Sequence, residues 1–235
     1  IRFSRSLLGF VERGQRTPNP DFVKRCDEAL SAGGELIRHW SDLRGEAGPH
    51  WFKGWLGVEK EAHTLHAWEP IVVPGLLQTE DYARAVIRGE PGITREQIAR
   101  AVAARMERQK ILSRPDSPTF RVILDEAVLY RLVGTEEIMR MQLKRLLEAL
   151  DSPRIGIQIV PMSAGVTTGV LGGFAIAQLS GHLDTVYIQT AIRGHVSNRP
   201  EDVKAIHDRY DKLRAEAQPQ LASIELIREA EKRWV

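Results

Sequence analysis

The chain has 235 residues and a mass of 26.5 kDa, enough for one large domain or for a small domain followed by a medium one. Hydrophobic residues make up 43% and charged residues 27%, the balance of a soluble globular protein. No apolar run is long enough to span a bilayer and no secretory leader opens the chain, so we expect no membrane partner. The single cysteine, Cys26, excludes an internal disulfide framework and favours a cytoplasmic location.

Positive charge is concentrated at the N-terminal end. The whole chain carries a formal net charge of only +2, but residues 1–20 hold four arginines and a single acid. A local basic patch of this kind suits contact with phosphates. A solvated helix face accounts for four arginines equally well, so the charge needs support from the pattern around it.

Residues 3–13 predict a short helix. Ser4 is a good N-cap because its hydroxyl can accept a bond from an orphan backbone N–H, and Leu8 and Val11 fall on one face. Gly14 stands where this helix should end.

A second helix is predicted from Asn19, an N-cap followed by a first-turn proline, to the Gly33-Gly34 pair. Its apolar stripe comprises Phe22, Val23, Cys26, Ala29 and Leu30. A loose, glycine-containing segment follows, and we place a domain boundary near residue 48.

Helices also dominate the next sixty residues. The spacing by three and four predicts a packed helix with its seam at Trp51, Trp55, Val58, Ala62 and Leu65. Thr79 caps a further helix. Thr94 and Gln97 form a capping box for another that runs to about Leu112.

Strands enter in the second half of the chain. Four are predicted, at residues 120–124, 155–159, 173–179 and 184–191, with a helix between the first two and a last long helix opening at Pro200. The fold class is therefore α+β. We expect an all-α piece over residues 1–47, then an α+β domain over 48–235 with a sheet of about four strands flanked by helices.

The first predicted helix has the form of a DNA-reading helix. With Leu8 and Val11 turned inward, the residues turned outward are Arg5, Ser6, Gly9 and Phe10. Arg5 can bond a guanine edge twice, and an exposed Phe10 suits the methyl group of thymine. Arg13 and Arg16, just beyond the helix, suit phosphates.

The segment "SRSLLGFVERGQRTPNPDFVKRCDEAL" resembles the recognition helix and following helix of the Xre/Cro-type helix-turn-helix regulators, through its serine-rich start, Glu12-Arg13-Gly14 and Arg16-Thr17-Pro18. The resemblance implies that Arg5, Ser6, Gly9 and Phe10 face bases, with Arg13 and Arg16 near the DNA backbone. The first two helices of that family would precede Phe3, so we expect the beginning of the DNA-binding domain to be missing from this chain.

The remainder resembles the WhiJ-like, antitoxin-like effector domain of bacterial regulators. The resemblance covers about residues 50–190 and is most specific at Pro74-Gly75-Leu76-Leu77-Gln78-Thr79. It implies a transcription regulator, and a small partner protein encoded nearby.

Each of three weaker patterns can be interpreted either as a chemical site or as an ordinary structural feature. His63, His66 and Glu69 could offer a metal-binding helix face or simply be surface and packing residues. The Asp125-Glu126 pair could serve acid–base chemistry or cap the next helix. The glycine-rich stretch 165–173 lacks the lysine and the spacing of a phosphate loop, so we interpret it as a flexible hairpin.

We therefore predict a transcription regulator that reads the major groove of a double-stranded DNA operator with the helix starting at Ser4 and is controlled through its effector domain. A homodimer would pair two such helices about one DNA turn apart. No enzyme activity, catalytic residue, metal or cofactor is expected. The alternative is an antitoxin-like interaction module that mainly binds a small partner protein.

Overall fold

The computed structural model describes residues 3–13, 15–16, 18–43, 50–190 and 194–234. The chain divides into two compact units, Ile1–His50 and Trp51–Val235. The boundary predicted near residue 48 and the helix stop at Gly14 lie outside the described residues.

The first unit contains three helices, α1 (Arg5–Glu12), α2 (Pro20–Ala29) and α3 (Glu35–Leu43). Both predicted N-caps are confirmed. The Ser4 hydroxyl accepts a hydrogen bond from Leu7 N at 3.2 Å, and the Asn19 side chain accepts one from Phe22 N at 2.8 Å. The turn chemistry therefore sets where α1 and α2 begin.

Helix α3 corrects the prediction of a loose segment after the glycine pair. The carboxylate of Asp27, buried on α2, accepts hydrogen bonds from Gly34 N at 2.6 Å and Leu36 N at 2.8 Å. The Asp27 side chain therefore accepts from backbone N–H groups at the start of α3 that have no partner within the helix. Asp27 lies on the preceding helix, so local sequence patterns do not reveal this contact. The stripe predicted for α2 also ends early, since Leu30 is 71% exposed and Ala29 is exposed as well.

The second unit is built on one six-stranded sheet in the order β3-β2-β1-β4-β5-β6. Its strands are β1 (Thr64–Glu69), β2 (Thr119–Asp125), β3 (Ile155–Val160), β4 (Phe174–Gln178), β5 (Thr185–Gln189) and β6 (Gly194–Ser197). Strands β1, β2 and β3 run parallel, whereas β4 pairs antiparallel with β1 and the hairpin partners β5 and β6 continue antiparallel.

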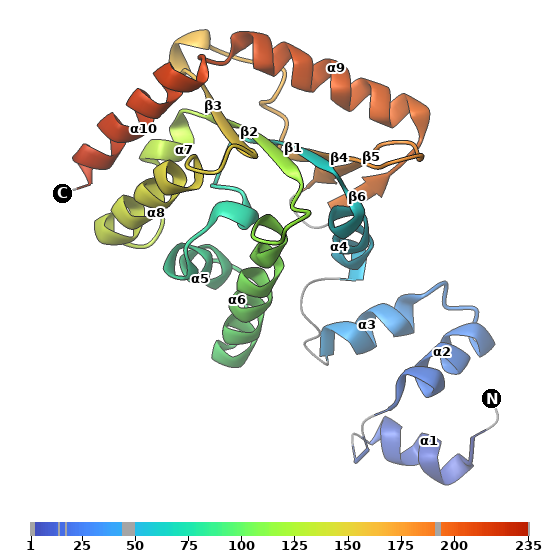
Figure 1. Ribbon diagram of the computed structural model, residues 1–235. Helices are drawn as coiled ribbons and strands as arrows, with labels where there is room; N and C mark the ends of the chain where they lie inside the picture. The colour runs from blue at the N-terminus through green and yellow to red at the C-terminus, as the bar shows by residue number, and fades with distance from the viewer. Residues whose placement is uncertain (1–2, 14, 17, 44–49, 191–193, 235) are drawn as a thin grey trace. The chain divides into compact units, whose positions relative to one another are not determined.

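Helices cover both faces of this sheet. Helix α9 (Pro200–Glu216) packs its Ile206, Tyr210 and Leu213 on one face (Figure 1). The other face and its surroundings carry α4 (His50–Glu61), α5 (Glu80–Arg88), α6 (Arg95–Gln109), α7 (Ala127–Tyr130), α8 (Glu136–Ala149) and α10 (Gln220–Arg233). Short 3-10 turns lie at Gly75–Leu77, Lys110–Leu112 and Met162–Ala164.

The mixed α and β composition agrees with the prediction, but the count of about four strands was too low. The four predicted strands correspond to β2, β3, β4 and β5. Strand β1 was missed because the predicted helix was carried on to Leu65, whereas α4 ends at Glu61. Strand β6 was also missed, because it has only four residues and lies at the edge of the sheet.

Candidate nucleic-acid interface

The residues predicted to face DNA bases lie along one side of α1. Arg5, Ser6, Gly9 and Phe10 follow one another at helical spacing, and Arg13, which was predicted as a phosphate contact, continues the same side at the C-cap. All are exposed except Gly9, which is half-buried, and the Phe10 side chain is 45% exposed. The sequence therefore located a continuous, accessible surface.

The opposite side of α1 is apolar. Leu7, Leu8 and Val11 are half-buried there, and no residue of Arg5–Glu12 is fully buried. A helix that reads bases with its polar side and packs on its apolar side needs this division.

Contacts with the rest of the first unit hold the segment before α1 and the turn after it. The ring of Phe3 packs on that of Phe22 with centroids 5.0 Å apart. The indole N–H of Trp40, on α3, donates to the Pro18 carbonyl at 2.8 Å. These contacts tie both ends of the α1 segment to the rest of the first unit.

Arg13 does not extend away from the helix. Its guanidinium carbon lies 5.4 Å from the centroid of the Phe10 ring, and its Nε donates to Gln15 Oε1 at 3.2 Å. The guanidinium folds back over Gly9, where a Cβ would sit 3.0 Å from Arg13 Nη1. Arg16 is exposed beyond the end of α1, and its backbone N–H closes that end by donating to Phe10 O.

In the second unit, the segment Pro74–Thr79 is held by side-chain hydrogen bonds. The buried Gln142 donates from Nε2 to Leu77 O and accepts at Oε1 from Thr79 N, both at 2.8 Å. Gln109 donates to the carbonyls of Gly75 and Gln78, each at 2.8 Å. The most specific motif of this unit therefore has a structural role in the fold.

A buried ion pair joins α4 to α6, and the sequence patterns did not reveal it. Glu59 is only 2% exposed and receives three hydrogen bonds from Arg108, at 2.8 and 3.0 Å from Nε and at 2.5 Å from Nη2. Trp55 Nε1 donates to the same carboxylate at 2.9 Å. The ring of Phe52 lies 4.8 Å from the guanidinium of Arg108.

Glu69, at the end of β1, lies close to this pair. Among the described residues it has no hydrogen bond or ion pair. Burial raises the pKa of its carboxyl to about 8, although the positive charges of Arg108 and Arg105 lower it. Burial in turn lowers the pKa of Arg105 to about 10, although this guanidinium donates to Gln78 Oε1 at 2.8 Å.

The helical placement predicted for His63 and His66 is wrong, because both residues lie outside α4. His63 is exposed and precedes β1, whereas His66 is on β1 and its ring packs on Tyr210, with centroids 4.7 Å apart. Burial lowers the pKa of His66, with His207, Arg214 and Arg121 adding to the effect and Asp184 opposing it. Within the described ranges, no three His, Cys, Asp or Glu residues are placed to share a metal ion.

The acidic pair after β2 binds backbone groups. Asp125 Oδ1 accepts from Ala127 N at 2.9 Å, and Glu126 Oε2 accepts from Met162 N at 2.7 Å. Both carboxylates therefore stabilise turns at the end of the parallel strands. This agrees with the structural interpretation of the pair.

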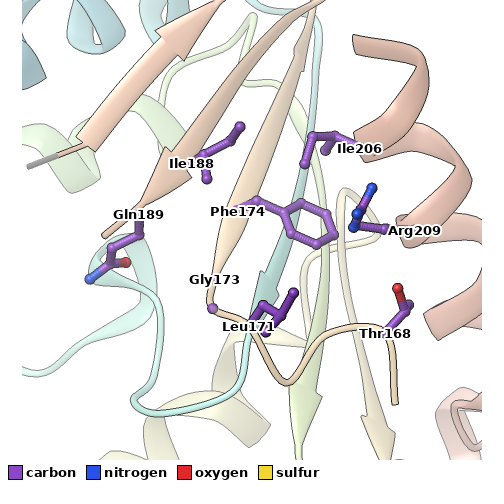
Figure 2. A pocket seen from close by; sticks show the side chains of 9 residues that line it. Thr168, Leu171, Gly173, Phe174, Ile188, Gln189, Ile206 and Arg209 are labelled. Atoms are coloured by element: carbon purple, nitrogen blue, oxygen red, sulfur yellow. The ribbon is translucent and has the colours of Figure 1, made fainter. Parts of the chain in front are cut away.

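A small hollow opens at the α9 face of the sheet. Figure 2 shows Leu171, Phe174, Ile188, Ile206 and Arg209 around it. Its volume of about 80 Å³ is well below the roughly 300–1,000 Å³ of a typical ligand pocket. This volume does not identify an effector site.

The sheet with helices on both faces and the three-helix unit before it define a two-part α and β protein. Residues 52–229 match the family described as "Domain of unknown function (DUF5753)", and the chain belongs to this family. No curated protein and no solved structure matches the chain. None of the helices in the described ranges is both long and apolar enough to cross a membrane.

Proposed function

We propose that this protein is a DNA-binding transcription regulator that reads the major groove with α1. The observation that carries the proposal is the surface of α1, where Arg5, Ser6, Gly9, Phe10 and Arg13 lie together on the accessible side. Arginine, serine and an aromatic ring are suited to base edges and to the thymine methyl group. Domains of the matched family commonly occur alongside Xre-type helix-turn-helix proteins, which supports the same assignment.

The second unit then serves as the regulatory part, in which dimerisation and the binding of an effector or partner change the affinity for DNA. A homodimer would bring two copies of α1 to half-sites about one DNA turn apart. This arrangement predicts an operator with two-fold symmetry.

Binding to the DNA upstream of the gene tests the proposal. Fluorescence anisotropy over a salt series would compare this region with an unrelated duplex of equal length and composition. We expect selective binding that Arg5→Ala weakens by about 1–3 kcal/mol at the specific site only. Arg16→Ala should weaken binding to both duplexes alike and reduce the salt dependence, since a phosphate contact carries no sequence information. Equal affinity of the wild-type protein for both duplexes would refute the proposal.

An interaction module for a small partner protein is the second candidate. One observation favours it: the segment 162–171 leaves four large apolar side chains exposed, those of Met162, Val166, Val170 and Leu171. Exposed apolar groups gathered in one segment are typical of protein-binding surfaces. Copurification of a small protein encoded beside the gene, lost in the double variant Val166→Ser/Leu171→Ser, would favour this candidate if DNA binding is unselective.

A further inference from the structure

The Arg13 side chain leans back along α1 by about one helical turn, the direction that side chains on a helix take. Its guanidinium lies over Gly9 and beside Phe10, on the surface that also carries Arg5 and Ser6. Arg13 therefore shares the base-reading surface of α1.

Two contacts hold this conformation. The guanidinium carbon is 5.4 Å from the centroid of the Phe10 ring, within the range of a cation–π interaction. Gln15 Oε1 accepts from Nε at 3.2 Å. Because Nε is engaged, the two terminal amino groups, Nη1 and Nη2, remain as a fork of donors, and no acceptor among the described residues bonds to them.

Gly9 provides the space for the guanidinium. A Cβ at this position would lie 3.0 Å from Nη1, closer than ordinary van der Waals contact, so a larger residue would push the guanidinium aside. Glycine inside a helix lowers its stability relative to alanine. The presence of glycine here thus has a geometric reason in the position of Arg13.

We propose, on the basis of the DNA-binding function above, that Phe10 and Arg13 act as a pair that reads a thymine and a neighbouring guanine. The fork of Arg13 bonds guanine O6 and N7, and the Phe10 ring contacts the methyl group of the neighbouring thymine. The two side chains are in mutual contact, so the two bases must be neighbours. Arg13 is then a specificity-determining residue, and Arg16 remains as the phosphate contact.

Chemically modified DNA tests this pairing directly. Sites selected by the wild-type protein from a random duplex pool would be aligned, and each neighbouring thymine and guanine altered in two ways. Replacing guanine by 7-deazaguanine removes N7, and replacing thymine by uracil removes only the methyl group. We expect each change to weaken wild-type binding, by about tenfold for 7-deazaguanine. The Arg13→Ala variant should lose the effect of 7-deazaguanine, and Phe10→Ala the effect of uracil.

Gly9→Ala supplies a control for folding, because alanine favours the helix while its Cβ displaces Arg13. This variant should keep its helicity by circular dichroism and yet discriminate guanine from 7-deazaguanine less well. Arg16→Ala should retain the full discrimination.

Three results would overturn the inference: selected sites without a neighbouring thymine and guanine, an Arg13→Ala variant that still discriminates 7-deazaguanine, or equal weakening of all sequences by Arg13→Ala. The first two leave the DNA-binding function in place, and the third makes Arg13 a phosphate contact. If the wild-type protein selects no sequence at all, the proposed function is refuted, and base reading by Phe10 and Arg13 is refuted with it.

Discussion

The ion pair between Glu59 and Arg108 offers a sharp test of how the second unit is held together. In Arg108→Met the side chain keeps an unbranched apolar stem but loses the guanidinium and its three hydrogen bonds to a carboxylate that is only 2% exposed. Removing one partner of a buried pair leaves the other charge uncompensated and costs about 3–5 kcal/mol of unfolding free energy. Trp55 Nε1 still donates to Glu59, so we expect the lower end of this range.

The loss should come from the carboxylate charge of Glu59, which stays buried without its cationic partner. Adding Glu59→Gln removes the buried charge, and the double variant should be more stable than Arg108→Met alone at pH 8.

Urea unfolding at pH 8, followed by circular dichroism, measures these differences. Arg100→Met on the exposed side of the same helix is the matched control and should change stability by less than about 0.5 kcal/mol. A loss below about 1 kcal/mol at pH 8 for Arg108→Met, or one that the second substitution does not relieve, would refute the reasoning.

Further predictions concern other buried positions of the same unit. Gln142→Leu leaves two backbone groups of segment 77–79 without partners and should lower the unfolding free energy in urea by about 2–4 kcal/mol. A loss of less than about 0.5 kcal/mol would show that water replaces these hydrogen bonds. The raised pKa of Glu69, about 8, means that stability falls as pH rises from the ordinary range of a glutamate to about 8, and Glu69→Gln should remove this slope from a pH series of melting temperatures. An unchanged slope would assign it to other groups. Gly169→Ala places a Cβ 2.3 Å from the ring of Trp68 and should cost about 1–3 kcal/mol and alter the near-ultraviolet circular dichroism; an unaltered spectrum would contradict this close packing.

Local signals predicted α1 and α2 of the first unit and much of the second unit. The caps at Ser4 and Asn19 are short-range chemistry, since an oxygen within three residues satisfies an orphan N–H. The same holds for Thr79 and for the capping box of Thr94. The helical spacing of residues 5–13 also sufficed to place the candidate interface on one surface.

Strand β1 shows where the periodic signal is ambiguous. Leu65 and Ala67 alternate with His66 and Trp68, which is the strand period, but Leu65 also continues the helical spacing of α4. The parallel partner β2 and the antiparallel partner β4 decide the outcome, because together they satisfy the backbone groups of β1 on both sides. Those partners are distant in sequence, and their pairing is not visible in the local pattern.

The sequence by itself determined the starts of α1, α2, α5, α6 and α9, four of the six strands and the residues on the outward side of α1, because each depends on near neighbours in the chain. It did not reveal α10, which follows the helix predicted as the last. Only the tertiary structure decided that α3 exists and that Glu59 and Arg108 meet across two helices. The physical reason is common to both cases. A buried carboxylate takes its position from whichever partners the fold brings within bonding distance, and residue spacing alone does not specify them.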